Sequence, residues 1–343
     1  MDFVGLDLNL TWFILIGILL TGYAILDGFD LGVGALHLFT STDSERRIMI
    51  NSIGPVWDGN EVWLVTGGGA LFAAFPAVYA SVFSGFYTAF MLLLAVLIFR
   101  AVAIEFRSKQ PMKWWRQMWD VAFSLSSILI SFLMGVALGN MVVGIPIGSS
   151  KEFSISIAEL LNPYAVLVGV TTVALFMMHG SIYVVMKTEG DMQNKIRGWV
   201  NNSIIFFAIC YVTTTMATLL YVPHMSEPFK QHPMFFIVAL VGMLAIANIP
   251  REIHHGREFF AFLSSCASIF SLMALFAIGI FPNFVMSNIS PEFNLTIYNA
   301  ASSQKTLAIM LTIAIIGIPF VLAYTISIYW IFRGKVRLDS MSY

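Results

Sequence analysis

Charged side chains are scarce in this sequence of 343 residues: 11% are Asp, Glu, Lys or Arg, whereas 58% are hydrophobic. An ordinary soluble domain carries about 25% charged residues. The formal net charge of −1 offers no basic surface to a phosphate backbone, and the sequence has no zinc-finger spacing or RNA-binding motif. The composition therefore excludes an ordinary soluble domain, and no nucleic-acid partner is expected.

Cysteine is also rare, and a basic leader segment is missing. The two cysteines, Cys210 and Cys266, lie in separate apolar runs, where a cysteine usually acts as a small buried hydrophobic residue. A disulfide framework is therefore not expected. The N-terminal stretch MDFVGLDLNL lacks the positive charge of a secretory signal, so the apolar run that follows is interpreted as a retained first helix.

Long apolar runs dominate the sequence instead. Windows of about 20 apolar residues, which cross about 30 Å of hydrocarbon, occur near residues 9–38, 52–75, 77–104, 118–140, 163–187, 199–222, 234–250, 257–281 and 304–332. The sequence therefore predicts an all-α polytopic membrane protein with nine transmembrane helices.

The basic residues predict the orientation of these helices. One set of loops holds three lysines, Lys151, Lys230 and Lys305. The other set holds Arg46, Arg47, Arg107, Lys109, Lys113, Arg116, Lys187, Lys195, Arg197, Arg251, Arg257, Arg333, Lys335 and Arg337. Basic loops stay in the cytoplasm, so the N-terminus is predicted outside and the C-terminus inside.

Five ionisable residues are predicted to lie at one depth within the first three spans. At 1.5 Å per helical residue, Asp27 and Asp30 in the first span reach the level of Asp58 and Glu61 in the second and Arg100 in the third. Each acidic pair is spaced i,i+3, which places both carboxylates on one helical face. We expect a charged layer near the cytoplasmic side.

Glycines beside these acids favour close helix packing. Gly28 and Gly32 form a G-x-x-x-G pattern, which lets a second backbone approach. Residues 67–69 are three consecutive glycines in the second span, and they suggest the same. The acidic faces are therefore predicted to point into a helix bundle.

Two interpretations of this layer remain open. Ionisable groups inside a membrane usually mark ion pathways and proton relays, and Asp58, Asp27 and Glu61 are the candidates for proton transfer. Alternatively, Arg100 forms a structural ion pair, expected with Asp30, that ties the helices together. A proton role is favoured for Asp58, and a structural role for Asp30 and Arg100.

Convergent metal or haem ligands are missing from the sequence. Only His179 is predicted to lie inside a span, and a single histidine of this kind is more often hydrogen-bonded core than axial ligand. No glycine-rich phosphate loop or nucleophile elbow is present. The chain thus has a candidate proton path and no reaction centre, which implies a partner.

Several sequence blocks resemble subunit II of the cytochrome bd quinol oxidases. They include LDGFDLGVGALHLF, ERRIMINSIGPVWDGNEVWLVTGGGALFAAFPAVYASVFSGFY, FRAVAIEFRSK, MWD, LLNPYA and ASSQKTL, in the order of that family. The resemblance implies a prokaryotic respiratory complex in the cell (inner) membrane that oxidises quinol and reduces dioxygen to water, generating protonmotive force.

The resemblance also implies an architecture and a set of partners. The family arrangement is two four-helix bundles, here within residues 1–140 and 163–281, and an extra helix at 304–332. No cofactor is expected on this chain. Haem b and haem d, or a b haem in place of haem d, are expected on partner subunit I. The resemblance is also compatible with small single-span accessory subunits and with a bound structural quinone.

The resemblance assigns roles to the charged layer as well. The aspartate of the family's WDGN motif belongs to a cytoplasmic proton route along the subunit interface, and it corresponds to Asp58. Asp27, Asp30 and Arg100 correspond mostly to interface or structural residues, and the family also admits Gln at the position of Glu61.

Two other functions remain as alternatives. An ion- or proton-coupled secondary transporter would bind its ion at the same layer, although inverted-repeat transporters place matched motifs in both halves and here the acids lie only in the first three spans. The third reading is a purely structural assembly partner with an inert acidic layer.

Overall fold

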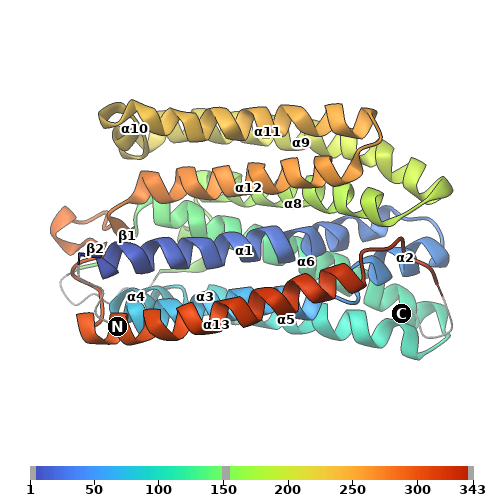
Figure 1. The fold of residues 1–343 in the computed structure, drawn as a ribbon, viewed down its shortest axis with the longest axis horizontal. Coiled ribbons are helices and arrows are strands. Elements are labelled where there is room, and N and C mark those ends of the chain that lie inside the picture. Colours follow the sequence, from blue (N-terminus) through green and yellow to red (C-terminus); the bar gives the residue numbers. More distant parts are fainter. Residues whose placement is uncertain (1–4, 149–154, 339–343) are drawn as a thin grey trace.

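The computed structural model describes residues 5–148 and 155–338, which form a bundle of long, roughly parallel helices (Figure 1). The long helices are α1 (Leu8–Leu36), α3 (Trp57–Ala74), α5 (Tyr87–Phe106), α6 (Lys113–Val143), α8 (Pro163–Lys187), α9 (Gly190–Tyr221), α11 (Phe236–His254), α12 (Glu258–Ile280) and α13 (Gln304–Ile331).

Short elements connect these helices. The short α-helices are α2 (Asp43–Ile53), α4 (Pro76–Gly85), α7 (Ile157–Leu160) and α10 (Glu227–Gln231). The 3-10 turns are η1 (His37–Phe39), η2 (Arg107–Lys109), η3 (Pro223–Ser226), η4 (Pro233–Phe235) and η5 (Pro291–Phe293). Strands β1 (Asn283–Val285) and β2 (Leu295–Thr296) pair antiparallel in a small hairpin that the sequence did not predict.

Local sequence sets several helix ends. Thr42 and Glu45 form a capping box at the start of α2, in which each side chain accepts a backbone N–H of the other residue. Asn162 accepts the N–H of Ala165 at the start of α8, directly before Pro163. Gly144 ends α6 with a φ of 93°, a conformation that glycine adopts without strain.

Eight helices of the described residues are long and apolar enough to cross a membrane. Together they place the chain among all-helical polytopic membrane proteins. The predicted span at 52–75 corresponds to α3, which begins only at Trp57, has 18 residues and is not one of the eight. The predicted span at 77–104 is interrupted at Phe86, between α4 and α5.

Helix α1 lies in the middle of the bundle and contacts α3, α6, α8 and α12 (Figure 1). Its G-x-x-x-G pattern explains the closest of these contacts. A Cβ on Gly32 would lie 1.8 Å from the carbonyl oxygen of Phe176 on α8, and a Cβ on Gly180 would lie 2.5 Å from the carbonyl carbon of Gly32. The predicted backbone approach at Gly32 is therefore confirmed, with α8 as the neighbour.

The glycine run at residues 67–69 packs less closely than expected. A Cβ on Gly67 would contact Leu20 of α1, but one on Gly68 or Gly69 would have nothing within 4 Å. The expectation of close packing is therefore wrong for Gly68 and Gly69, because those two positions of α3 point away from α1.

The last helix, α13, lies on the outside of the bundle against α1 and α3. Polar contacts anchor both of its ends. The indole N–H of Trp12 donates to the carbonyl oxygen of Leu307, at 3.0 Å, near the start of α13. Near its end, the hydroxyl of Tyr329 donates to Asn60 on α3, and the amine of Lys187 on α8 donates to the carbonyl of Phe332.

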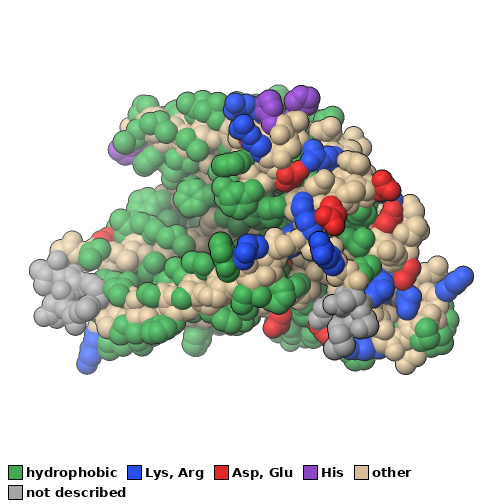
Figure 2. All heavy atoms as spheres, turned by 45° about the vertical axis from the view of Figure 1, so that its right-hand side comes forward, with side chains coloured by type: hydrophobic (Ala, Val, Ile, Leu, Met, Phe, Trp, Pro, Cys, Tyr) green, Lys and Arg blue, Asp and Glu red, His purple; other side chains and the backbone are tan. Residues whose placement is uncertain are grey.

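Side chains of different kinds separate along the molecule. Figure 2 shows most of the charged side chains gathered toward the right-hand end, while hydrophobic side chains cover most of the rest. Many exposed side chains on α5, α9, α11 and α13 are large and apolar. Such a surface is suited to lipid or to another membrane subunit.

Candidate functional site

The charged layer is centred on an ion pair between α1 and α5. Two nitrogens of the Arg100 guanidinium, Nη2 and Nη1, donate to the two carboxylate oxygens of Asp27, at 2.5 and 3.0 Å. Both side chains have no exposed surface. A bidentate pair of this kind is one of the strongest hydrogen-bonded arrangements available to an arginine.

Glu61 of α3 extends this pair toward the surface. Its Oε2 lies 3.7 Å from Nη1 of Arg100, and its side chain is 22% exposed. Two carboxylates from different helices therefore share one guanidinium. Asp27, Glu61 and Arg100 were predicted to lie at one depth, and the structure brings all three into contact distance.

Asp30 has a different partner from the one expected. Its Oδ2 accepts a hydrogen bond from the side-chain amide of Asn60 on α3, at 2.8 Å. The guanidinium of Arg100 binds Asp27 instead, so the expected Arg100–Asp30 ion pair is wrong. The two aspartates are about one turn apart on α1. Asp30 faces α3, whereas Asp27 faces α5.

Asp58 lies at the outer edge of this arrangement. It occupies the first turn of α3, one turn before Glu61, and its side chain is exposed on the surface of the chain. Exposed side chains elsewhere on α3 and on α5 include Val62, Val65 and Ile98, which are all apolar. The carboxylates thus run inward from Asp58 through Glu61 to the Arg100–Asp27 pair.

His179, the histidine predicted to lie inside a span, is held by hydrogen bonds in the core of the bundle. His179 of α8 is fully buried and uses both ring nitrogens, one with the hydroxyl of Ser265 at 2.7 Å and the other with the carbonyl of Ile25 at 2.9 Å. The predicted role of His179 as a hydrogen-bonded core residue is confirmed. No group of three or more His, Cys, Asp or Glu residues in the described ranges is placed to hold a metal ion.

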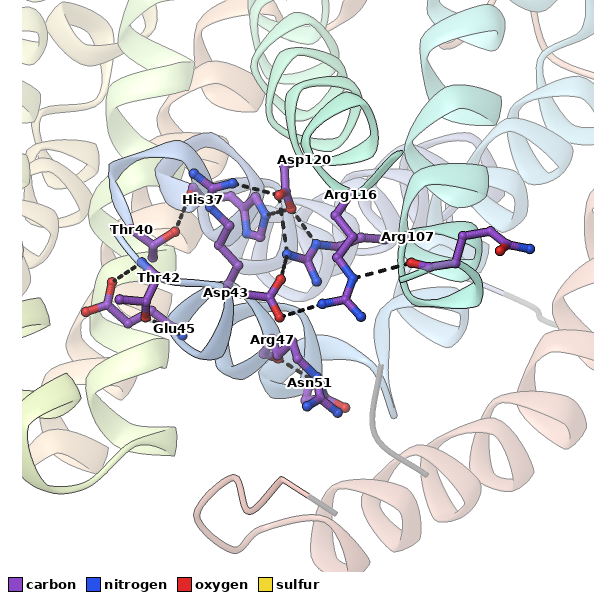
Figure 3. A network of polar contacts seen from close by, with 12 residues as sticks. His37, Thr40, Thr42, Asp43, Glu45, Arg47, Asn51, Arg107, Arg116 and Asp120 are labelled. Atoms are coloured by element: carbon purple, nitrogen blue, oxygen red, sulfur yellow. Dashed lines mark hydrogen bonds and ion pairs between the residues drawn. The ribbon is translucent and has the colours of Figure 1, made fainter. Parts of the chain in front are cut away.

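A second buried polar network lies near the charged end of the bundle, and the sequence analysis missed it (Figure 3). The carboxylate of Asp120 on α6 accepts from Nε2 of His37 at 2.6 Å, Nε of Arg107 at 2.5 Å and Nη1 of Arg46 at 2.8 Å. Arg107 also donates to Asp43 at 2.8 Å. The network joins α2 and α6 to the ends of α1 and α5.

The sequence contained a signal for this second network. Asp120 stands in the MWD motif, inside an apolar run, where an unpaired carboxylate would be costly. Arg46 and Arg107 are predicted from the sequence only as basic residues of the cytoplasmic loops. Their convergence with His37 depends on η1 and η2, two turns that periodicity does not reveal.

A surface ion pair joins α2 to the first turns of α9, before the predicted span at 199–222. The amine of Lys195 lies 2.8 Å from Oε2 of Glu45. Burial raises the pKa of Glu45, but the hydrogen bonds from Lys195 and from the N–H groups of Ser41 and Thr42 outweigh it and lower that pKa below its ordinary value. Glu45 is therefore held in its charged form as part of the α2 capping box.

An apolar cleft of about 1800 Å³ opens in the bundle. Its lining is mostly apolar and includes Leu20 of α1, Phe72 of α3, Leu97 of α5, Phe176 of α8 and Met273 of α12. The lining contains no Asp or Glu, so the cleft differs in character from the charged layer, although α1, α3 and α5 contribute to both.

These features define a multi-pass helical membrane protein that carries ionisable groups inside its bundle. The comparisons with known proteins agree with this class. Residues 8–332 match the family model described as cytochrome bd terminal oxidase subunit II. The chain belongs to this family, and it is therefore a subunit of a terminal oxidase complex.

Individual relatives cover nearly the whole chain. Cytochrome bd-I ubiquinol oxidase subunit 2 of Escherichia coli K12 is 34% identical over 365 residues, covering 97% of this chain and 96% of that protein. Cytochrome bd ubiquinol oxidase subunit 2 of Bacillus subtilis is 33% identical over 341 residues, covering 97% and 98%.

A solved structure shares the fold. A chain of the bd oxidase from Geobacillus thermodenitrificans superimposes with a TM-score of 0.77 at 17% identity, covering 96% of this chain and 98% of that one. The family resemblance seen in the sequence is confirmed by the family model and by the two curated relatives.

Proposed function

We propose that this chain is the haem-free subunit of a quinol:oxygen oxidoreductase and that it relays cytoplasmic protons toward the haem at which dioxygen is reduced on subunit I. The proton route begins at Asp58 and continues through Glu61 to Asp27. The observation that carries this proposal is the inward series of carboxylates, exposed at Asp58, half-buried at Glu61 and fully buried at Asp27.

The surface around Asp58 supports a protein partner at this face. An ionised carboxylate that faces lipid is costly, by about 2.5–3.5 kcal/mol at the centre of a membrane helix and by less near its end. Covering the apolar face of α3 and α5 with another subunit would place Asp58 at a protein interface instead. Subunit I is that partner in this proposal, and other exposed helices offer room for small single-span subunits.

The proposed topology has nine transmembrane helices, with α3 as the second and with α4 and α5 together as the third. Residues 1–140 and 163–281 form two four-helix bundles, and residues 304–332 form the extra helix. The gathering of charged side chains at one end supports a cytoplasmic location for that end (Figure 2). The N-terminus then faces outward and the C-terminus faces the cytoplasm of a prokaryotic cell.

The cofactors are assigned to the partner. Haem b and haem d belong to subunit I in this proposal, because both nitrogens of His179 are already hydrogen-bonded. The names of the relatives from Escherichia coli and Bacillus subtilis support ubiquinol as a substrate of the complex. The apolar cleft has enough volume for a structural quinone.

An Asp58→Asn variant tests the proposed relay. In the purified complex we expect normal assembly and a normal haem spectrum, together with slower oxygen consumption, because Asn keeps the shape of Asp but cannot exchange a proton. Asp191→Asn, an exposed residue in the first turn of α9, is the matched control. Full oxygen consumption by Asp58→Asn would favour the purely structural role of this chain.

The family assignment argues against the transporter alternative. Membership of a terminal-oxidase subunit family accounts for the acidic layer without a transported ion. Isolation from native membranes provides a direct check, because the proposal expects a haem-bearing partner to co-purify and to give a reduced-minus-oxidised haem spectrum.

A further inference from the structure

We propose that Asp30 is a neutral carboxylic acid in the resting protein and that Tyr329 of α13 is the positioning residue that holds it, acting through Asn60. The protonation state of Asp30 does not depend on the proposed relay. Its use as a proton store for the relay does rest on the proposed function.

The charges around Asp30 support a neutral state. Asp30 has no exposed surface, and the nearest cation, Arg100, gives both of its short hydrogen bonds to Asp27. Glu61 already lies 3.7 Å from the same guanidinium. Ionisation of Asp30 would therefore place a third carboxylate against one arginine in a dry interior, and a buried carboxyl in that position takes up a proton.

Within the part of the chain that the structure describes, no other element packed around Asp30 supplies a cation. Tyr183 of α8 and Tyr329 of α13 are the remaining titratable groups that interact with it, and both are neutral phenols at ordinary pH. His179 of α8 lies in the same region but is engaged with Ser265 and Ile25. When every neighbouring described helix is included, Arg100 is still the cation that Asp27, Glu61 and Asp30 would have to share.

The Asn60 amide has a defined orientation. Its Nδ2 donates to the backbone carbonyl of Leu26 at 3.1 Å, which only a donor can do, and also to Oδ2 of Asp30 at 2.8 Å. Its Oδ1 therefore faces Tyr329, whose hydroxyl donates to it at 2.9 Å. The chain of hydrogen bonds runs in one direction, from Tyr329 through Asn60 to Asp30.

This direction locates the proton on Asp30. Because Oδ2 accepts from the amide, the acidic proton belongs on Oδ1. That atom is buried and has no hydrogen-bond partner among the described residues. Oδ1 is therefore the atom at which the proton is lost and regained.

Infrared spectroscopy of the purified complex tests the inference directly. A protonated carboxyl gives a C=O stretch that is distinct from carboxylate bands and shifts in D2O. We expect Asp30→Asn to remove one such band and Asp58→Asn to retain it. Loss of a carboxylate band in Asp30→Asn, with all carboxylic-acid bands intact, would overturn the proposal.

A second variant keeps the test decisive if Asp30→Asn does not assemble. Tyr329→Phe removes only a hydroxyl, and we expect it to shift the frequency of the Asp30 band, because the Asn60 amide loses its donor. Tyr324→Phe is the control on the same helix, where the side chain is 65% exposed. An unchanged band in Tyr329→Phe would show that Tyr329 does not position Asp30.

The relay and the neutral state of Asp30 fail independently. Full oxygen consumption in Asp58→Asn would remove the relay, and any use of Asp30 as a proton store with it, but would leave the Asp30 band in place. Absence of the Asp30 band would show that Asp30 is ionised and leave the Asp58 result standing.

Discussion

Arg100 on α5 binds the carboxylate of Asp27 on α1 through two hydrogen bonds, and neither side chain has any exposed surface. This pair connects two helices far apart in the sequence and neutralises the deepest carboxylate of the series. Because Glu61 also lies 3.7 Å from Arg100, a change in the protonation of one acid alters the electrostatic environment of the other.

Removal of Arg100 is expected to destabilise the protein strongly. Arg100→Met leaves Asp27 buried and unpaired, which costs about 3–5 kcal/mol. The double variant Asp27→Leu/Arg100→Met should regain part of this loss, because no unpaired charge remains at the centre. Thermal denaturation of the purified complex measures both, and Lys305→Met, at an exposed position, is the control. Equal melting temperatures for Arg100→Met and the control would contradict this account.

Close packing of α1 on α8 makes a second prediction. Gly32→Ala would place a methyl group 1.8 Å from the carbonyl oxygen of Phe176, so the helices must separate and assembly should fail or fall sharply. Gly17→Ala on the same helix is the control, since a Cβ there has nothing within 4 Å. The yield of assembled complex in detergent is the measurement. A normal yield from Gly32→Ala would mean that α1 and α8 do not approach in this way.

The network around Asp120 should be important for stability. Asp120→Asn removes the negative charge that His37, Arg46 and Arg107 share, and only Asp43 remains to balance Arg107. We expect a loss of about 3 kcal/mol, the lower end for a broken buried ion pair. Chemical denaturation measures the loss, with Glu189→Gln at an exposed position as the control. If the free energy of unfolding of Asp120→Asn differed from that of the wild type by less than the experimental error, the network would not stabilise the fold.

The pair of Glu45 and Lys195 predicts a dependence of stability on pH. The pKa of Glu45 is lower in the folded protein than its ordinary value of about 4.5. Its contribution is therefore present above pH 4.5 and is lost as the pH falls through the lowered value. Because both side chains are partly exposed, the effect is about 0.2–1 kcal/mol.

Melting temperatures of the wild type and Glu45→Gln test this dependence. The difference between the two proteins should be largest near neutral pH and should shrink as the solution becomes more acidic than pH 4.5. A difference that grows on acidification would reverse the sign of the expected linkage.

The sequence predicted the common depth of the charged residues better than it predicted which of them form ion pairs. Helical rise placed Asp27, Asp30, Glu61 and Arg100 at one depth, and the structure brings them together. Rise alone does not give the direction in which each side chain points. The choice between Asp27 and Asp30 as the partner of Arg100 depends on the rotation of α1 about its axis, which packing against α8 at Gly32 determines.

Other features required tertiary structure. The Asp120 network depends on two short turns that bring His37 and Arg107 to α6. The role of Asn60 became clear only when Tyr329, 269 residues later in the sequence, was found as its donor. The hairpin of β1 and β2 is too short to produce an alternating pattern of apolar residues.

Proton uptake during a single turnover tests the proposed relay most directly. The reduced complex is mixed with dioxygen while haem absorbance follows electron transfer and a pH-sensitive dye follows proton uptake from the cytoplasmic side. For Asp58→Asn the account predicts that electron transfer before the first proton-dependent step keeps its rate, whereas proton uptake slows at least about tenfold, a barrier increase of about 1.4 kcal/mol. Proton uptake at the wild-type rate in this variant would contradict it.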